Sequence, residues 1–187
     1  MRSRVFWVLP LLFCGASKAV EPHFYLGAGL DVGGDEVLKI KYVGGGSDSL
    51  RAGEGVHLVL GTDVDFADRY MARATIGYKE GGITAKNGDA TFSRVPVELT
   101  GYRFWGEHGL GAGLTRQSNI RMRCDFSGGI CPFSKVDVKD ATGVLIEYLY
   151  RVRHADTNRG YSIGVRIGGI DYQAEGGGRE ISGGFFG

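Results

Sequence analysis

The chain has little proline, no long apolar run beyond its first residues, and almost no excess of charge of either sign. Only 4 of its 187 residues are proline, and 22 basic side chains stand against 21 acidic ones. A chain so close to neutrality gives no reason to expect nucleic acid as a partner. Past residue 20, no segment approaches the roughly 20 apolar residues of a membrane-spanning helix, so helical membrane proteins are excluded.

Glycine, by contrast, is abundant. The chain contains 33 glycines, well over twice the roughly 7% of average usage. Glycine is unfavourable inside helices, and there is no collagen-like period, so a helical bundle and a triple helix are both excluded. Apolar residues at 43% and aromatics at 11% are enough for a core, which argues against disorder. A turn-rich β protein of one domain remains.

The N-terminus has the order of a secretory signal peptide. Two arginines are followed by an apolar run at Val5–Phe13 and then by small residues up to Ala19. This order predicts export, with residues 1–19 removed and residues 20–187 forming the mature domain.

Two cysteines remain after that cleavage, Cys124 and Cys131, on either side of a turn-rich stretch. An exported protein with one cysteine pair across a loop is expected to form a disulfide there. The alternative, a metal site, would need four ligands. We therefore predict a disulfide between them.

Alternation of apolar and polar residues with period 2 is the main pattern of the mature chain. It recurs in segments of about nine to fourteen residues, the length a tilted strand needs to cross a bilayer. In one of them Val56, Leu58 and Leu60 share a face, with His57 and Asp63 on the other. The predicted strands are residues 23–33, 55–66, 70–80, 92–105, 110–123, 141–153, 161–174 and 179–187.

Connections between these segments alternate in length. Long connections at residues 34–54, 81–91 and 124–140 alternate with short ones at 67–69 and 106–109. Such alternation is typical of an up-and-down barrel whose two ends face different environments.

Two of the long connections also contain alternating stretches, at residues 36–43 and 135–139, which predict β extensions outside the membrane. Aromatic residues near the short turns are expected to form one girdle. They are Phe24, Phe66, Tyr70, Phe104, Trp105, Tyr161 and Phe185.

The polar face of the strands combines charges of both signs with many glycines, as expected for a narrow interior filled with ion pairs and small residues. A soluble lipocalin-like barrel would instead turn its charges to water and enclose its apolar face. We therefore predict an all-β, eight-stranded antiparallel up-and-down transmembrane β-barrel. Its predicted lumen charge network is Asp31, Asp63, Arg73, Lys79, Glu98, Glu147, Arg151, Arg166 and Glu180.

With this pattern, and with an aromatic C-terminal strand at Ile181–Phe186, the whole mature chain resembles the small eight-stranded bacterial outer-membrane barrels, the family of the OmpA transmembrane domain, OmpX and the lipid A deacylase PagL. The resemblance implies a Gram-negative outer membrane and insertion by the outer-membrane assembly machinery through the C-terminal strand. That family's last residue is usually phenylalanine, whereas this chain ends at Gly187. We expect a monomer.

Catalytic residues are not indicated. Barrel enzymes of this size pair a histidine with a serine and a carboxylate, and the deacylase pattern, a serine two residues after a histidine, is absent. His57 is the histidine expected inside near the long-loop end, within reach of Ser47, Ser49 or Asp31. A lumen hydrogen bond explains it without catalysis.

A metal or cofactor is not expected either, because Asp63, Asp65 and Asp68 lack the glycine and final glutamate of a calcium loop. Near the long-loop end, Arg116, Arg121 and Arg123 are candidates for contact with lipopolysaccharide phosphates. Uninterrupted alternation would, however, place the last two on the lumen face.

The predicted function is therefore a non-catalytic outer-membrane protein with a structural or loop-mediated binding role, through lipopolysaccharide or a surface partner. A lipid A or phospholipid-modifying barrel enzyme is the alternative, and a soluble lipocalin-like barrel is the third hypothesis.

Overall fold

The protein is all-β and antiparallel, as predicted. A computed structural model describes residues 22–41, 45–127, 131, 134–154, 159–173 and 181–187. The predicted signal peptide and Glu180 lie outside these residues. The strands are β1 (Pro22–Asp31), β2 (Glu36–Lys41), β3 (Ser47–Arg51), β4 (Gly55–Ala67), β5 (Tyr70–Ala85), β6 (Gly88–Trp105), β7 (His108–Phe126), β8 (Lys135–Val138), β9 (Ala141–His154), β10 (Arg159–Tyr172), β11 (Ile181–Ser182) and β12 (Phe185–Phe186).

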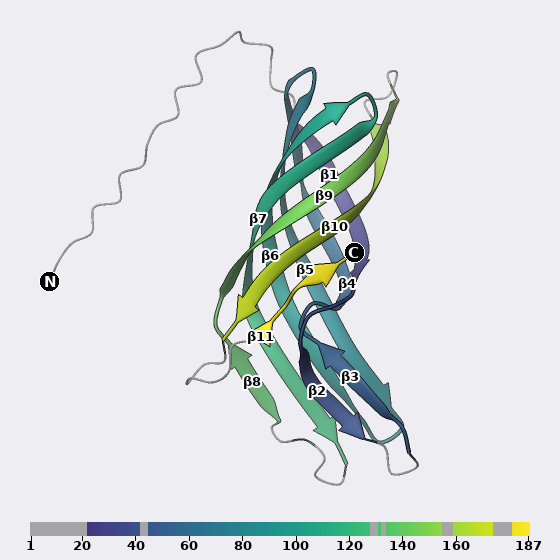
Figure 1. The fold of residues 1–187 in the computed structure, drawn as a ribbon, viewed down its shortest axis with the longest axis vertical. Helices are drawn as coiled ribbons and strands as arrows, with labels where there is room; N and C mark the ends of the chain where they lie inside the picture. Colours follow the sequence, from purple (N-terminus) through teal and green to yellow (C-terminus); the bar gives the residue numbers. More distant parts are fainter. Residues whose placement is uncertain (1–21, 42–44, 128–130, 132–133, 155–158, 174–180) are drawn as a thin grey trace, which may run out of the picture.

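One twisted sheet of ten strands forms most of the molecule (Figure 1), in the order β1-β4-β5-β6-β7-β9-β10-β11, with β8 paired to β7 and β12 to β10. β2 and β3 form a separate hairpin. Within the described residues, no helix has the length and apolar character needed to cross a membrane. β2 and β8 confirm that the alternating stretches within two predicted long connections form β-strands.

The predicted long loop at residues 81–91 is wrong, because β5 and β6 continue through it to a tight turn at Lys86–Asn87. These two strands and β7 are 16, 18 and 19 residues long. They extend past the ends of their neighbours on the side of the β2–β3 hairpin (Figure 1). We call this side the hairpin end, and the side of the short turns at residues 68–69 and 106–107 the turn end.

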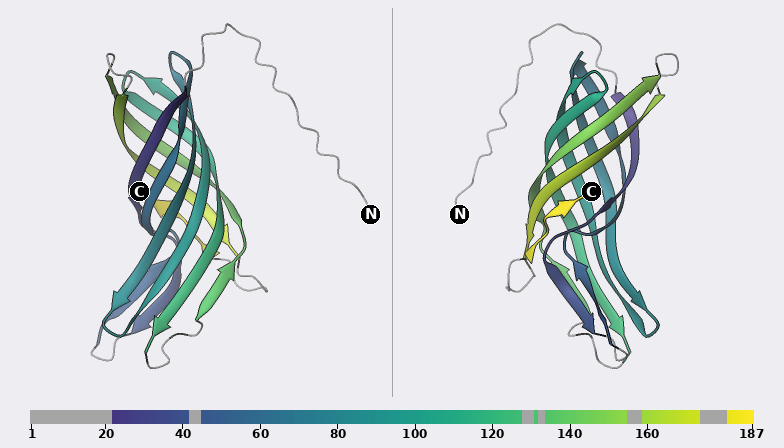
Figure 2. Two further views of the ribbon diagram at one scale, coloured as in Figure 1. Left: turned by 180° about the vertical axis from the view of Figure 1, so that it is seen from behind. Right: turned by 45° about the vertical axis from the view of Figure 1, so that its right-hand side comes forward.

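The prediction of a closed, eight-stranded barrel differs from the structure. The eighth predicted segment is present only as β11 and β12, interrupted at Gly183–Gly184. Among the described residues, one isolated bridge between Val32 and Phe186 joins this segment to the β1 edge. The sheet is therefore not closed, and the right-hand view of Figure 2 shows β1 and β10 separated towards the turn end. Closure fails because the short last segment reaches only part of the way along β10.

Near the turn end, the sheet exposes apolar side chains on its outer face. Along β5, for example, Ile76 and Tyr78 are exposed while Thr75 and Lys79 are buried. We call the exposed set the apolar band. Its members include Phe24, Leu26, Leu30, Val56, Leu58, Leu60, Phe66, Ile76, Val97, Leu99, Trp105, Leu110, Leu114, Val144, Ile146, Tyr161, Ile163, Val165 and Ile167.

At the hairpin end the same strands reverse this arrangement. On β5 the outward residues become Glu80, Gly82 and Thr84, while Ile83 is buried. We call this part the extension; it comprises β2, β3, β8 and the hairpin-end halves of β5, β6 and β7. Its enclosed core consists of Leu38, Ile40, Leu50, Ala52, Ile83, Ala90, Phe92, Ile120, Met122, Cys124, Phe126, Ala141, Ile170 and Tyr172.

A β-bulge in β7 sets the alternation within the extension. Asn119 has a left-handed φ of 51°, and Arg94 on β6 stands opposite both Asn119 and Ile120 because the register shifts between Ser93 and Val95. One extra residue on a strand moves every later side chain to the other face.

Because of this bulge, Arg121 and Arg123 are exposed on the outer face, and the expectation from simple alternation that they face the interior is wrong. Cys124 and Cys131 form the predicted disulfide, which links the end of β7 to the segment before β8.

The predicted aromatic girdle is present in part. Phe24, Phe66, Tyr70, Trp105 and Tyr161 are exposed on the outer face, and the rings of Phe66 and Tyr70 stack at 6.1 Å.

Phe104 and Phe185, by contrast, are buried. Neighbouring residues on a strand point to opposite faces, so Phe104 cannot share the outer face with Trp105. Phe185 likewise alternates with the exposed Phe186.

Candidate functional site: the charged interior and the outer arginines

Asp31, at the end of β1, is the centre of the largest group of interior charges. Its carboxylate accepts hydrogen bonds from Lys79 Nζ at 2.6 Å and from Arg166 Nη2 at 2.7 Å, and His57 Nδ1 lies 3.3 Å away. The Asp31 side chain has no exposed area. Four strands, β1, β4, β5 and β10, therefore meet at one carboxylate.

Arg166 extends this group across the interior. It also donates to Glu98 on β6 at 3.1 Å, and Lys79 donates to the carbonyl oxygen of Gly53 at 2.7 Å. The Phe185 ring lies against both cations, with its centroid 5.0 Å from Lys79 Nζ and 5.2 Å from Arg166 Cζ. Hydrogen bonds and the aromatic face thus replace the water that these cations give up on burial.

A second group lies nearer the turn end. Arg73 on β5 binds Asp63 on β4 with two hydrogen bonds, at 2.7 and 2.9 Å, which is the bidentate geometry suited to a carboxylate. The Tyr25 ring lies 3.7 Å from the guanidinium carbon. Tyr102 donates its hydroxyl proton to Glu147 at 2.6 Å.

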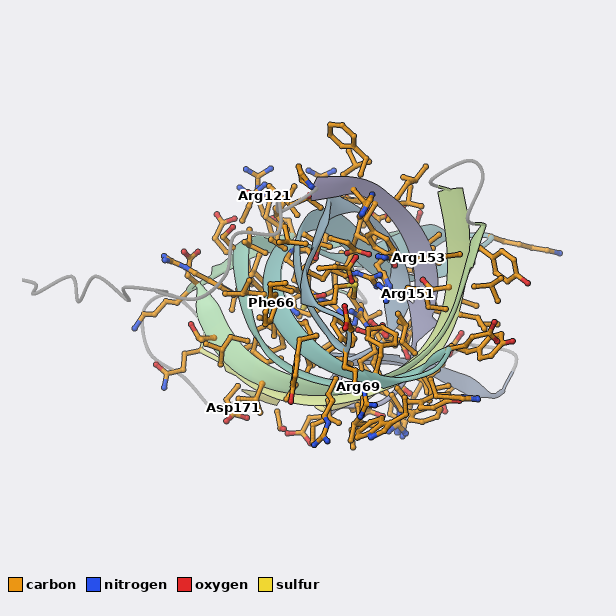
Figure 3. The ribbon with its side chains drawn as sticks, turned by 90° about the horizontal axis from the view of Figure 1, so that it is seen from above. Phe66, Arg69, Arg121, Arg151, Arg153 and Asp171 are labelled. Atoms are coloured by element: carbon orange, nitrogen blue, oxygen red, sulfur yellow. A yellow bond between two sulfur atoms is a disulfide. The ribbon has the colours of Figure 1, made fainter. Side chains whose placement is uncertain are left out.

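The third group is the most open. Arg151 and Arg153 on β9 both contact Asp65 on β4, and Arg151 Nη1 lies 3.2 Å from the carboxylate. The side chain of Arg151 is 16% exposed and that of Arg153 is 43% exposed. Figure 3 shows both arginines inside the curve of the sheet and Arg121 outside it.

The predicted network is thus divided between groups. Asp31, Lys79, Glu98 and Arg166 come together, Asp63 pairs with Arg73, Glu147 faces a tyrosine, and Arg151 pairs with a carboxylate outside the predicted set. Glu180 lies outside the described residues.

Sequence reasoning missed Asp65 and Arg94 as members of the interior network. Arg94 is fully buried and donates to the carbonyl oxygen of Glu54 at 2.7 Å. Both residues share the inward alternation of Asp63 and Glu98, so the same pattern contained the signal.

Two cavities lie within the curve of the sheet. One, of about 170 Å³, is lined by polar residues that include His57, Glu98, Tyr102, Glu147 and Arg166. The other, of about 630 Å³, lies between β1 and β10 at the turn end, and its lining includes Arg73, Arg151 and Arg153.

His57 has the position predicted for it, facing Asp31 from the inner side of β4. Within the described part of the chain, the ring nitrogens of His57 face Asp31 and Arg166, and no serine or threonine hydroxyl lies within hydrogen-bond reach of them. A histidine between a carboxylate and a guanidinium can orient charge, but acyl transfer also needs a nucleophile within hydrogen-bond reach.

Basic and acidic side chains are interspersed on the outer face of the extension and at its border with the apolar band, where Arg116 lies. Arg116 binds Asp140 at 2.9 Å, Lys135 binds Asp137 at 3.1 Å, and Arg121 lies 4.0 Å from Asp137. Arg123 is exposed opposite Lys135 in the β7–β8 ladder. The predicted lipopolysaccharide contacts therefore share one exposed surface, which we call the outer arginine surface.

Within the described ranges, no cluster of three or more histidine, cysteine or carboxylate side chains has a geometry suited to a metal ion. The chain matches no protein-family model, no curated protein and no solved structure.

Proposed function

We propose that the chain is an integral outer-membrane β-barrel protein without catalytic activity. In this barrel the seven long strands β1, β4, β5, β6, β7, β9 and β10 are completed by the C-terminal segment in the eighth position. We further propose that the extension projects from the cell surface and binds lipopolysaccharide or a surface partner.

One observation supports the membrane assignment: along β5, β6 and β7 the outer face changes from apolar to polar, and the inner face changes from polar to apolar. Near the turn end, apolar side chains face outward and paired charges face inward; in the extension, polar side chains face outward around an apolar core. A strand whose outer face meets a single solvent is expected to keep one kind of side chain, apolar or polar, on that face along its whole length. Two solvents, hydrocarbon around the apolar band and water around the extension, account for the reversal.

The soluble alternative meets a large energetic cost. The apolar band is continuous over most of the sheet, whereas soluble monomers seldom expose apolar patches beyond a few hundred Å². The band also encloses charged pairs, the reverse of what a small hydrophobic ligand would require. These observations favour the membrane barrel over a lipocalin-like binder.

The orientation follows from the two ends. Outer-membrane barrels have short periplasmic turns and longer extracellular connections, so the turn end is proposed to face the periplasm. Exposed aromatic rings at that end, such as Trp105 and Tyr161, suit a membrane interface. The extension, which carries the outer arginine surface, would then meet the phosphates of lipopolysaccharide.

Membrane fractionation with electrophoresis tests the assignment. We would express the chain with residues 1–19 in a Gram-negative host, separate the membranes, and compare boiled with unboiled samples. A heat-shifted band in the outer-membrane fraction is expected. Soluble periplasmic protein without a shift would refute the proposal and favour the soluble barrel.

The binding role has its own test. Purified protein in detergent is titrated with lipopolysaccharide, and Arg121→Glu/Arg123→Glu is compared with Arg103→Glu, an outward arginine within the apolar band. Only the double variant should bind more weakly, by about tenfold if two guanidinium–phosphate contacts of about 0.7 kcal/mol each are lost. Equal binding by both variants would remove the outer arginine surface from the proposal.

A lipid-modifying enzyme is the second candidate, favoured by His57 beside Asp31 at the 170 Å³ cavity. Mass spectrometry of lipid A from cells expressing the chain or His57→Ala decides between them. A modification that disappears with the variant would establish catalysis and overturn the non-catalytic assignment.

A further inference from the structure

Arg103 on β6 is an exposed arginine that lies within the apolar band, near the turn end. Its side chain points to the outer face, and Trp105 follows two residues later on the same face. The guanidinium carbon lies 5.1 Å from the centre of the Trp105 ring. Among the described residues, no carboxylate forms an ion pair with Arg103. The group therefore has guanidinium donors left over at the edge of the proposed membrane.

A histidine and two tyrosines lie beside this arginine on the outer face. The ladders pair Trp105 with His108 and His108 with Tyr150. His108 is thus diagonally opposite Arg103 on the neighbouring strand, a separation of about 7–8 Å. The Nδ1 atom of His108 lies 2.6 Å from the hydroxyl oxygen of Tyr148. The imidazole is held at the same surface as the guanidinium group.

The hydrogen bonds around His108 leave a second donor on this surface. When the Tyr148 hydroxyl donates to Nδ1, the neutral imidazole carries its proton on Nε2. The carboxylate of Glu107, in the adjacent turn, accepts the hydroxyl proton of Tyr150 at 2.5 Å. This acid is therefore engaged by a tyrosine, while the imidazole Nε2–H and the guanidinium group are both available to an anion from outside the chain.

Small residues form the outer face next to Arg103, on the side towards the middle of the apolar band. Ala72, Gly101 and Ala112 are level with one another across β5, β6 and β7. A Cβ at Gly101 would meet no atom within 4 Å. Three neighbouring strands cover a width of about 10 Å, so apolar chains can lie flat against the sheet directly beside the arginine.

We propose that Arg103, Trp105 and His108 bind the phosphate of an anionic phospholipid in the periplasmic leaflet, with its acyl chains packed over Gly101. This inference rests on the proposed membrane location and concerns the opposite end of the molecule from the outer arginine surface. Arginine suits phosphate because it binds two oxygens at once, and tryptophan suits the level of the headgroups.

The chemistry of the surface favours a lipid over other phosphates. Inorganic phosphate would use the two donors but gain nothing from the small residues beside them. Lipopolysaccharide belongs to the other leaflet, at the end where the extension lies. Among phospholipids, a zwitterionic one carries its own ammonium group, which competes with Arg103 for the phosphate. An anionic phospholipid such as phosphatidylglycerol is therefore preferred.

Trp105 is a fluorescent probe within this site. The chain has two tryptophans, and the other, Trp7, belongs to the predicted signal peptide. Protein purified from outer membranes is inserted into phosphatidylcholine vesicles that contain a small fraction of phosphatidylglycerol with brominated chains, because bromine quenches tryptophan on contact. Compared with brominated phosphatidylcholine at the same fraction, this lipid should show an affinity about fivefold higher. That ratio corresponds to about 1 kcal/mol, as expected for one arginine near anionic lipid.

Variants assign the preference to particular side chains, each checked for folding by its heat shift. Arg103→Gln should abolish the preference, and Tyr148→Phe, which removes the hydroxyl that orients the imidazole, should reduce it. Arg121→Gln, on the outer arginine surface, is the matched control and should keep it. In Phe24→Trp/Trp105→Phe the probe reports the lipid beside β1 instead, and both brominated lipids should quench it equally.

Four results with heat-shifted protein would overturn the proposal. Equal quenching of Trp105 by both lipids would mean that lipid contacts this surface without selection. A preference that survives Arg103→Gln, or that appears equally beside β1, would reflect general attraction to the protein. Full relief of quenching by inorganic phosphate would assign the donors to a free anion, and relief by lipopolysaccharide would assign them to the lipid of the other leaflet. Absence from the outer membrane would instead refute the proposed function.

Discussion

Removing the charge of Asp31 should be among the most destabilising single changes in this protein. The carboxylate is fully buried and binds Lys79 at 2.6 Å and Arg166 at 2.7 Å. In Asp31→Asn, Arg166 keeps a charged partner in Glu98, whereas Lys79 keeps only neutral acceptors, the carbonyl oxygen of Gly53 and the amide oxygen of the substituted side chain. Breaking one partner of a buried pair costs about 3–5 kcal/mol.

The assay is urea unfolding of the protein in lipid vesicles, with the folded fraction read from the heat-shifted band. With a slope of about 2–3 kcal/mol per molar urea, the midpoint should fall by about 1–2 M. Asp140→Asn is the control, because its pair with Arg116 is largely exposed and should contribute less than about 1 kcal/mol.

A second variant distinguishes the loss of attraction between Asp31 and its partners from the cost of leaving the Lys79 ammonium group buried without a charged partner. Asp31→Asn/Lys79→Met removes the ammonium group that the single variant leaves unpaired, so it should recover part of the loss. If Asp31→Asn instead unfolds within about 0.5 kcal/mol of the parent, the interior is wet enough to solvate Lys79, and the reasoning from burial is refuted.

Three further changes test other parts of the fold. Cys124→Ser should lower the free energy of unfolding by about 2 kcal/mol, measured by urea unfolding, because the disulfide closes a short loop; no loss would show that the loop is ordered without it. Gly111→Val should cost about 1–3 kcal/mol because its Cβ would lie 2.5 Å from the Tyr102 ring, whereas Gly101→Ala faces open space and should be nearly neutral. Asn119→Val should destabilise by about 1–2 kcal/mol and Asn119→Gly should not, because valine disfavours a left-handed φ; equal stability would contradict the bulge geometry.

The strands and their two faces could be predicted because period-2 alternation is a local property of the sequence. It placed Leu58 outward and Asp63 inward, as the structure has them. The extent of β5 and β6 could not be predicted, because Gly81–Gly82 and Lys86–Asn87 are typical of loops. In the structure, backbone pairing and the packing of Ile83 into the extension core decide the outcome.

Neither the closure of the sheet nor the choice of ion-pair partners could be predicted from the alternation. Whether two edges meet depends on the number of strands and their registers, which are long-range quantities. The same holds for ion pairs: alternation marks Arg151 as inward, but only the register between distant strands brings it to Asp65. The outward direction of Arg121 depends on a single left-handed residue, Asn119, whose φ the alternation does not reveal.

The bulge at Asn119 also limits how the extension can change in length. In β7 it lies where the outward side chains change from the apolar band to the charged extension, so it resets the alternation between the two halves. Inserting one further residue there without a second bulge would turn Ile120 and Met122 towards water and both following arginines inward. Adding two residues to each of β5 and β6 at their turn would preserve every face, so this sheet can grow in steps of two residues while its charged interior keeps the same pairs.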